Sequence, residues 1–265
     1  MNGSIPTEEA VTEDALLGGR IRLRQPRDGY RAAIDPVLLA AAVPLRAGER
    51  VLDLGCGAGA VFLCLLAREP GLAVTAVERD PATAALARAN AASNGFGDRA
   101  EVVEADVAAL PPDWRAGGFD QAVSNPPYLP AERADPSPHA GRAAAGVEAG
   151  PDLAVWVGRA RRCLRHKGRL TMVHRADRLG DLLAALDGFG EVVVFPLWPR
   201  AGQEAKRVIV TARKGVRSPL RLAAGLVLHG GNGGYTKTAD AALRGAGLSL
   251  EAPARAGAPR IELPK

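Results

Sequence analysis

Short apolar runs, separated by longer and partly polar stretches, fill the middle of the chain. Four runs have the composition of buried strands, at residues 50–54, 73–77, from 101 to near 106, and 119–123. The stretches between them predict helices from residue 60 to Pro70 and from Pro81 to about Asn94, where Gly95 provides a C-cap. Strands that alternate with helices in this way build a parallel sheet.

The second half of the chain continues the pattern. Helices are expected at residues 153–164 and 177–186, with a fifth strand at residues 168–173 between them. Two further strands, at residues 192–197 and 207–212, are joined by a connection short enough to require antiparallel pairing. We therefore predict an α/β fold with a seven-stranded sheet, mostly parallel with an antiparallel last strand, and with helices on both faces.

The same pattern predicts how the chain is divided. Residues 46–215 form the main domain, and an extension at residues 1–45 contributes to its ligand pocket. Residues 216–250 decorate the main domain, and residues 251–265, rich in proline and basic residues, form a disordered tail. The Pro-, Ala- and Gly-rich stretch at residues 129–151 is too long for a simple connection and predicts a mobile substrate loop.

The composition is that of a soluble globular protein, with 47% hydrophobic and 24% charged residues among 265. Because no apolar run is long enough to span a membrane and the first residues lack a secretion signal, we expect a cytoplasmic protein. Three cysteines and four scattered histidines predict neither a disulfide framework nor a metal site. The formal net charge of +5 favours an anionic partner.

Three glycines follow the first predicted strand, at Gly55, Gly57 and Gly59. They lie in the turn between strand and helix, where a ligand must approach the backbone closely and only glycine permits that approach. The spacing also satisfies the loose dinucleotide pattern, so nicotinamide cofactors and S-adenosylmethionine both remain open. Asp53 would place a carboxylate near a ligand cation, such as the methionine amino group, which a dinucleotide does not have.

Two further acids lie at the carboxyl ends of predicted strands, where open parallel sheets bind ligands. Glu78 ends the second strand, and its carboxylate can accept hydrogen bonds from both hydroxyls of a ribose. Asp106 ends the third strand and can accept a hydrogen bond from an adenine amine. The alternative is that both are ordinary polar residues at strand ends or helix caps.

The run Asn125, Pro126, Pro127 and Tyr128 follows the fourth predicted strand. Amide and exocyclic amine nitrogens are weak nucleophiles because their lone pairs are delocalised. The Asn125 side chain and the Pro126 carbonyl can accept hydrogen bonds from such a nitrogen and aim it at a methyl donor. The prolines hold these acceptors in place, and Tyr128 offers a face for a flat base or amide. The alternative is a proline-rich turn that ends a strand.

Together these motifs resemble the class I S-adenosylmethionine-dependent methyltransferases of the N6-adenine and N5-glutamine type, over about residues 45–215. The resemblance implies a Rossmann-like sheet, S-adenosylmethionine as cofactor, and Asn125 to Tyr128 as catalytic residues. It also implies that Asn125 belongs to the cofactor-binding set together with Asp53, Gly55, Gly57, Gly59, Glu78 and Asp106. Other segments are similar to the bacterial tRNA(Val) adenine-N6 methyltransferase family, whose target is the adenine adjoining the anticodon. These segments are residues 29–31, 34–39, 174–179, 228–229 and 234–236.

Three other functions remain open. An N5-glutamine methyltransferase acting on a translation factor uses the same Asn-Pro-Pro-Tyr chemistry. Such enzymes carry a helical domain ahead of the catalytic one and a Glu-Pro segment after the motif, whereas this chain has about 45 preceding residues and only Glu148 before Gly150 and Pro151. A non-catalytic RNA-binding module would not need the intact acids and Asn125. A nicotinamide oxidoreductase would leave the Asn-Pro-Pro-Tyr run unexplained.

If the partner is tRNA, arginine and lysine side chains should contact its phosphates, and binding should weaken steeply with salt. The alternative is that these side chains are solvated surface charges. The candidates are Arg20, Arg22, Arg24, Arg27, Arg31, Arg159, Arg161, Arg162, Arg165 and Lys167, followed by Arg200, Lys206 and Lys214.

Overall fold

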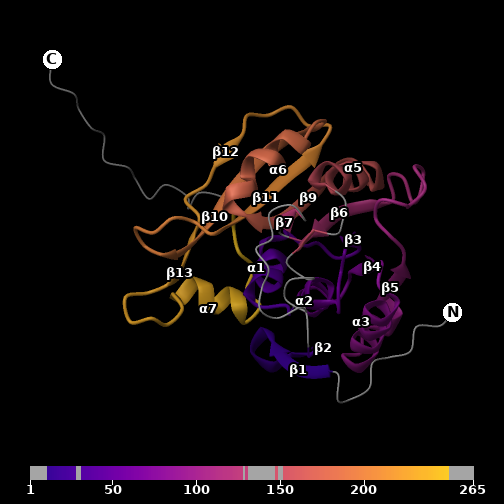
Figure 1. Ribbon diagram of the computed structural model, residues 1–265, viewed down its shortest axis with the longest axis horizontal. Helices are drawn as coiled ribbons and strands as arrows, with labels where there is room; N and C mark the ends of the chain where they lie inside the picture. The colour runs from indigo at the N-terminus through magenta and orange to yellow at the C-terminus, as the bar shows by residue number, and fades with distance from the viewer. Residues whose placement is uncertain (1–10, 28–30, 128, 131–146, 149–151, 251–265) are drawn as a thin grey trace.

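The main sheet has the predicted seven-stranded core. A computed structural model describes residues 11–27, 31–127, 129–130, 147–148 and 152–250, so Tyr128, most of the predicted substrate loop and the tail at residues 251–265 lie outside the described residues. The order of the core strands in space is β5 (Ala100–Glu104), β4 (Ala73–Glu78), β3 (Arg50–Leu54), β6 (Phe119–Ser124), β9 (Leu164–Arg175), β11 (Arg207–Lys214) and β10 (Phe189–Arg200) (Figure 1).

The strand directions confirm the predicted topology. Strands β5, β4, β3, β6 and β9 pair in parallel, whereas β11 is antiparallel to both β9 and β10. The register places Leu54 opposite both Val77 and Ser124, so the carboxyl ends of β3, β4 and β6 are level. This common edge is where a parallel sheet of this order binds ligands.

Two short strands make the sheet longer than predicted. β12 (Arg221–Leu222) and β13 (Leu226–His229) both pair in parallel with β10, and with them the sheet has nine strands among the described residues. Gly225 separates the two, with a φ of +82° and no room for a Cβ beside the Pro196 carbonyl. The apolar stretch at residues 220–228 is therefore two sheet-edge strands.

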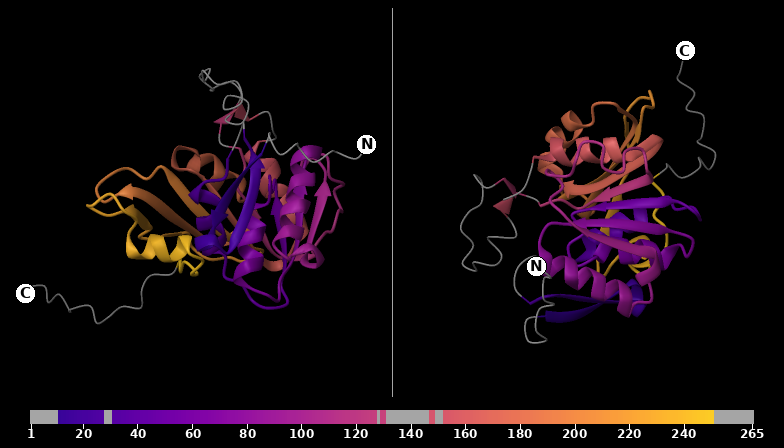
Figure 2. Two further views of the ribbon diagram at one scale, coloured as in Figure 1. Left: turned by 90° about the horizontal axis from the view of Figure 1, so that it is seen from below. Right: turned by 90° about the vertical axis from the view of Figure 1, so that its right-hand side faces the viewer.

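Helices cover both faces of the sheet, as predicted. One face packs against α1 (Ile34–Ala42), α2 (Ala60–Arg68), α3 (Pro81–Ser93) and α7 (Lys237–Leu243), and the other against α5 (Leu153–Cys163) and α6 (Leu179–Ala185) (Figures 1 and 2). The predicted helix at residues 177–186 consists of a 3-10 turn, Ala176–Arg178, followed by α6. No helix among the described residues is long and apolar enough to cross a membrane.

The N-terminal segment begins with a hairpin of β1 (Val11–Leu16) and β2 (Ile21–Pro26), which pair antiparallel. The turn between them contains the 3-10 helix Leu17–Gly19. Leu17, Ile21 and Leu23 are buried in the core that also holds α1, α2 and part of α3. The hairpin therefore lies along α2 and α3 as part of the main body (Figure 1).

Three smaller elements complete the described chain. A 3-10 turn, Gly97–Arg99, precedes β5. Two-residue strands β7 (Leu129–Pro130) and β8 (Val147–Glu148) pair in parallel with each other.

Candidate active site

Most of the residues predicted to bind a ligand gather at the carboxyl edge of the sheet. Asp53 lies in β3, Glu78 ends β4, and Asn125 directly follows β6. Ser124 joins two of these strands, because its buried hydroxyl donates to the Leu54 carbonyl at 2.8 Å. The glycine-rich turn and the Asn-Pro-Pro run are thus held side by side.

The three glycines of the turn have different surroundings, although each has a positive φ. A Cβ on Gly55 would lie 2.7 Å from the Trp156 ring, and one on Gly59 would lie 2.6 Å from the Phe62 ring. A Cβ on Gly57 would meet no protein atom within 4 Å. Gly55 and Gly59 are therefore required by protein packing, whereas Gly57 faces open space in which a ligand can lie against the backbone.

Asp53 is a buried acid with an unusual environment. Its side chain is fully buried, and no side chain among the described residues forms a hydrogen bond with either carboxylate oxygen. Burial raises the pKa of Asp53 to about 7, the Phe62 backbone amide in the first turn of α2 lowers it in part, and the nearby Glu78 charge raises it further. A buried carboxylate without a side-chain partner fits a ligand that brings a cation, such as an ammonium group.

Glu78 connects the glycine-rich turn to the end of β4. Its Oε2 accepts a hydrogen bond from the Gly57 amide at 3.0 Å, and its Oε1 accepts one from the Asp80 amide at 2.9 Å. The turn is also tied to β4 by the Gly55 and Cys56 amides, which both donate to the Val77 carbonyl. The half-buried Glu78 carboxylate lies beside the open space at Gly57.

The third strand was expected to end near Asp106, but it ends two residues earlier. β5 ends at Glu104, and Asp106 begins the turn that follows. Its Oδ1 accepts a hydrogen bond from the Ala108 amide at 2.8 Å, as a capping residue does. The strand pattern missed this because the Ala105 amide still donates to the Glu78 carbonyl and residues 105 and 106 remain half-buried, although β5 has ended. The role of Asp106 toward an adenine stays a prediction.

The Asn-Pro-Pro run leaves β6 at the level of the glycine-rich turn. Asn125 and Pro127 are half-buried and Pro126 is buried. His174, near the end of the adjacent strand β9, is 1% exposed, and its ring contacts the backbone of Pro127. Burial and the neighbouring Arg178 lower the pKa of His174 to about 4, so this imidazole is neutral at pH 7.

Sequence reasoning missed four residues that shape this site: Ser124, Trp156, His174 and Asn90. Trp156 in α5 packs against Gly55. Asn90 is completely buried in α3 and donates to the Ala58 carbonyl within the glycine-rich turn at 2.9 Å. A signal for Asn90 was present, because asparagine is a poor helix former and this one lies in the interior of an Ala-rich helix. Trp156 carried no such signal.

Three predicted RNA contacts lie away from the carboxyl edge or are buried. Arg159 is only 7% exposed and donates hydrogen bonds to the carbonyls of Val107, Leu110 and Pro111, so the prediction that it contacts phosphate is wrong. Arg165 and Lys167 lie at the amino edge of the sheet, opposite Asn125. Arg159 was misjudged because the amphipathic pattern of its helix does not show which arginine turns inward.

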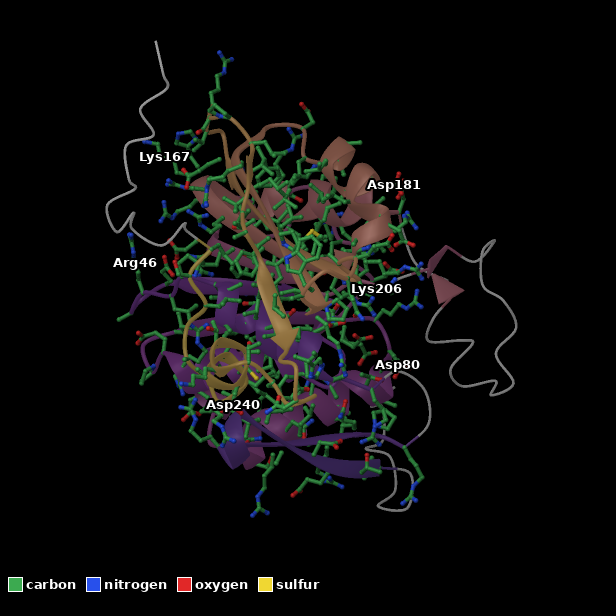
Figure 3. All side chains as sticks on the ribbon, turned by 90° about the vertical axis from the view of Figure 1, so that its left-hand side faces the viewer. Arg46, Asp80, Lys167, Asp181, Lys206 and Asp240 are labelled. Carbon is green, nitrogen blue, oxygen red and sulfur yellow. The ribbon has the colours of Figure 1, made fainter. Side chains whose placement is uncertain are left out.

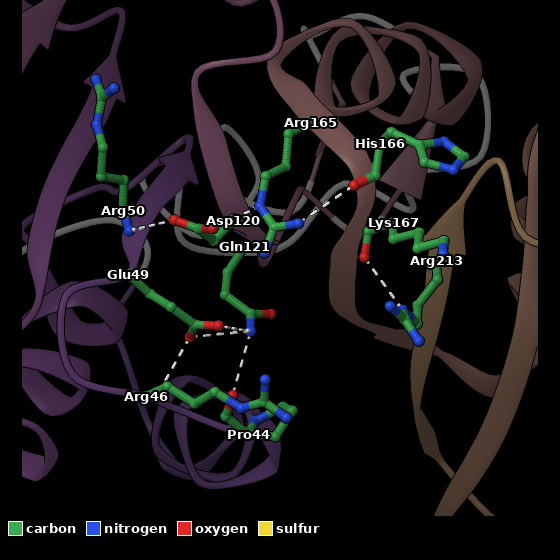
Figure 4. A network of polar contacts seen from close by, with 10 residues as sticks. All are labelled: Pro44, Arg46, Glu49, Arg50, Asp120, Gln121, Arg165, His166, Lys167 and Arg213. Atoms are coloured by element: carbon green, nitrogen blue, oxygen red, sulfur yellow. Dashed lines mark hydrogen bonds and ion pairs between the residues drawn. The ribbon is translucent and has the colours of Figure 1, made fainter.

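The amino edge has its own polar network. Asp120 accepts from Arg165 at 2.6 Å and from the Arg50 amide at 2.8 Å, and Gln121 donates to Pro44 and Glu49 (Figure 4). A cleft of about 830 Å³ opens here between β6, β9 and β10. Figure 3 shows Arg46 and Lys167 on the side opposite Asp80 and Lys206. This cleft is thus separate from the glycine-rich turn.

Several of the segments that carried the closer family resemblance have visible structural roles, whereas Gly29 and Tyr30 lie outside the described residues. Asp35, at the start of α1, pairs with Arg207 of β11 at 3.0 Å. His229 stacks on Tyr235 with ring centroids 4.8 Å apart, and Thr236 caps α7 by accepting from the Ala239 amide. Among the described residues, no group of three or more His, Cys, Asp or Glu side chains can hold a metal ion.

A sheet of this strand order, with a glycine-rich turn after β3, an acid at the end of β4 and Asn-Pro-Pro after β6, defines a class I S-adenosylmethionine-dependent methyltransferase. The family model for the methyltransferase small domain matches residues 34–192, and the chain belongs to that family. Its cofactor is S-adenosylmethionine.

The chain is also similar to individual proteins of known name or structure. The tRNA1(Val) (adenine(37)-N6)-methyltransferase of Aeromonas hydrophila is 30% identical over 213 residues, which cover 79% of this chain and 87% of the relative. A protein of the same name from Porphyromonas gingivalis is 35% identical over 173 residues, which cover 62% of this chain and 66% of that relative. The crystal structure of a predicted O-methyltransferase, protein Atu636 from Agrobacterium tumefaciens, is 28% identical, covers 81% of this chain and 98% of its own, and has a TM-score of 0.69.

Proposed function

We propose that this chain methylates N6 of the adenine adjoining the anticodon of a valine tRNA. The observation that carries the proposal is the Asn125-Pro126-Pro127 run, which leaves β6 beside the glycine-rich turn and is held to β3 by the hydrogen bond from Ser124. Relatives that bear the name tRNA1(Val) (adenine(37)-N6)-methyltransferase support the choice of acceptor. The reaction would take place in the cytoplasm, where tRNA is modified.

The described residues fit the cofactor. Asp53, buried and without a side-chain hydrogen-bond partner among them, would hold the methionine ammonium group. Glu78 would accept hydrogen bonds from the ribose hydroxyls, with Gly57 allowing close approach. Asp106 would accept from the adenine amine through the oxygen that does not cap its turn. Two nearby acids in a buried setting also favour a ligand with net positive charge.

The chemistry assigned to the chain is positioning and polarisation. When bound, S-adenosylmethionine supplies a methyl group activated by a sulfonium. The Asn125 side-chain oxygen and the Pro126 carbonyl would accept hydrogen bonds from the adenine amine, which localises the nitrogen lone pair and aims it. The prolines restrict the backbone that carries both acceptors. No strong base is required, because the nitrogen becomes acidic once it carries the extra bond.

Basic side chains near this edge would contact the RNA. Lys206 is exposed and directly precedes β11, whose start lies at the carboxyl edge. An anticodon loop suits such a site because its bases are already unpaired, so that little energy is needed to present one of them.

The test also distinguishes two other methyl acceptors, a protein glutamine and an oxygen atom. The Asn-Pro-Pro run would also suit a glutamine side chain, and the solved relative is described as an O-methyltransferase. The chain is incubated with labelled S-adenosylmethionine and either unmodified tRNA transcripts or purified release factor, and the products are digested and analysed by mass. Label recovered as N6-methyladenosine in a valine tRNA is the expected result. Label in protein, or in a ribose or base oxygen, would overturn the proposal.

A further inference from the structure

Helix α3 presents two asparagines, one turn apart, to the backbone of strand β2. Asn94 Oδ1 accepts from the Arg22 amide at 2.9 Å, and its Nδ2 donates to the Arg22 carbonyl at 2.7 Å. Asn90 does the same one turn earlier, with the Arg24 amide at 3.0 Å and the Arg24 carbonyl at 2.8 Å. The two side-chain amides thus pair with alternate residues of β2, as a neighbouring strand would.

Asn90 makes one contact that Asn94 does not. Its Nδ2 also donates to the Ala58 carbonyl at 2.9 Å, within the glycine-rich turn. Asn90 is fully buried, whereas Asn94 is half-buried. Three segments that are distant in sequence therefore meet at the Asn90 side chain: the hairpin, α3 and the glycine-rich turn. Both the donor and the acceptor atom of this side chain form hydrogen bonds.

The position of this contact within the turn matters. The first half of the turn is fixed by the Gly55 and Cys56 amides, which donate to Val77, and by the Gly57 amide, which donates to Glu78. The second half must reverse into α2 through Gly59, whose φ is +102°. The peptide between Ala58 and Gly59 is held at both ends, because its Gly59 amide donates to the Cys56 carbonyl at 3.0 Å and its Ala58 carbonyl accepts from Asn90. Asn90 thus ties this peptide to α3 and the hairpin at the point where the chain leaves the open space at Gly57.

We propose that Asn90 is a positioning residue for S-adenosylmethionine: it locks the second half of the glycine-rich turn against the hairpin β1–β2. The hairpin then belongs to the cofactor site although none of its residues lies in the turn. Asn90 acts through the peptide it holds and touches no reacting atom. The inference rests on the cofactor role of the turn and not on the identity of the methyl acceptor.

Asn94 provides a matched control. Asn90→Ala and Asn94→Ala each remove a pair of hydrogen bonds to β2, but only Asn90→Ala releases Ala58. Calorimetric titration with S-adenosylmethionine should give a dissociation constant raised about tenfold or more by Asn90→Ala, from the loss of one or more buried hydrogen bonds, and about twofold or less by Asn94→Ala. In turnover assays, KM for the cofactor should rise while KM for the acceptor stays unchanged.

A second variant covers the case in which Asn90→Ala fails to fold. Asn90→Ser keeps a hydroxyl donor in a smaller side chain and should give an intermediate loss of cofactor affinity. Equal affinity losses in the Asn90 and Asn94 variants, or wild-type affinity in a folded Asn90 variant, would overturn the inference. Because cofactor binding is measured without an acceptor, these outcomes are independent of whether the tRNA proposal holds.

Discussion

The backbone amide of Gly57 donates to Oε2 of Glu78 at 3.0 Å, joining the turn after β3 to the last residue of β4. The same Glu78 charge is one of the influences that raise the pKa of Asp53. Glu78 therefore interacts with both of the other groups, with Gly57 through a hydrogen bond and with Asp53 through its charge. A site arranged in this way needs little reorganisation when it binds a cationic ligand.

Gly57→Ala tests whether the open space at this glycine belongs to the cofactor. A Cβ there meets no protein atom, so the folded state should lose only about 1–2 kcal/mol from the positive φ, or roughly 2–8 °C in Tm. Cofactor affinity should fall much more, by about a hundredfold, because the methyl occupies ligand space. Gly95→Ala is the control, with a φ of +75° and open surroundings at the end of α3.

Measured together, the two variants separate strain from ligand contact. Both should lower Tm to a similar extent in thermal unfolding, and only Gly57→Ala should weaken binding in calorimetry. Unchanged cofactor affinity in Gly57→Ala would place the ligand elsewhere.

Asp53 should make cofactor binding depend on pH. A pKa raised to about 7 means that the carboxyl is largely protonated below that pH, and it must ionise to pair with an ammonium group. Cofactor affinity should therefore increase from pH 6 to pH 8, and Asp53→Asn should weaken binding at pH 8 and flatten this dependence. Titration calorimetry over this range measures both effects.

The same group has the opposite effect on the stability of the ligand-free chain. Because the pKa of Asp53 in the folded chain lies above the ordinary aspartate value of 3.8, protonation of Asp53 stabilises the fold at low pH, and this contribution is lost as pH rises through 7. At pH 8 Asp53→Asn should therefore unfold at a higher temperature than wild type, while binding the cofactor more weakly. A variant that is less stable and binds normally would contradict the assignment of Asp53.

Asn125→Ala should abolish transfer while leaving cofactor binding largely intact. Removing an oriented polar group that acts on the developing charge costs about 10²–10³-fold in turnover. The glycine-rich turn is held to β4 through the Gly57–Glu78 hydrogen bond, so the dissociation constant of S-adenosylmethionine should change little. Single-turnover transfer and calorimetry measure the two quantities separately. Full turnover in this variant would refute the proposed chemistry.

Arg159 should contribute to stability and not to RNA binding. Its guanidinium is buried and bonded to three backbone carbonyls after β5. Arg159→Met leaves those carbonyls without partners and should cost about 3 kcal/mol or more. The slope of log affinity for tRNA against log salt should stay as in wild type. In Lys206→Ala, by contrast, stability should be unchanged and that slope should be reduced.

Much of the fold was predictable because hydrophobic periodicity reflects burial directly. The strands at residues 50–54 and 119–123 were placed within one residue of β3 and β6, since both are buried runs bounded by strong turn residues. The edge strands β12 and β13 were not predicted, because they form only by pairing with Val193 and Leu197 of β10, which are distant in the sequence.

Site residues could be predicted where the expected chemistry requires a particular residue type. Residues that contribute only through tertiary packing could not be predicted. Asp53, Glu78 and Asn125 stand out because acids and Asn-Pro-Pro at strand ends serve few structural purposes. Asn90 and Trp156 come from helices on opposite faces of the sheet, and their contacts with the glycine-rich turn follow from tertiary packing. No local pattern encodes which of the arginines on α5 faces inward.

The most direct test of the central claim is to map the methylated nucleotide in a single purified RNA. Unmodified valine tRNA is incubated with S-adenosylmethionine and the wild-type chain or Asn125→Ala, digested with a base-specific ribonuclease, and analysed by mass spectrometry. We predict one added methyl group, released as N6-methyladenosine, on the adenine adjoining the anticodon with the wild-type chain and none with Asn125→Ala. A methyl group on another atom or residue, or equal products from both proteins, would contradict the account.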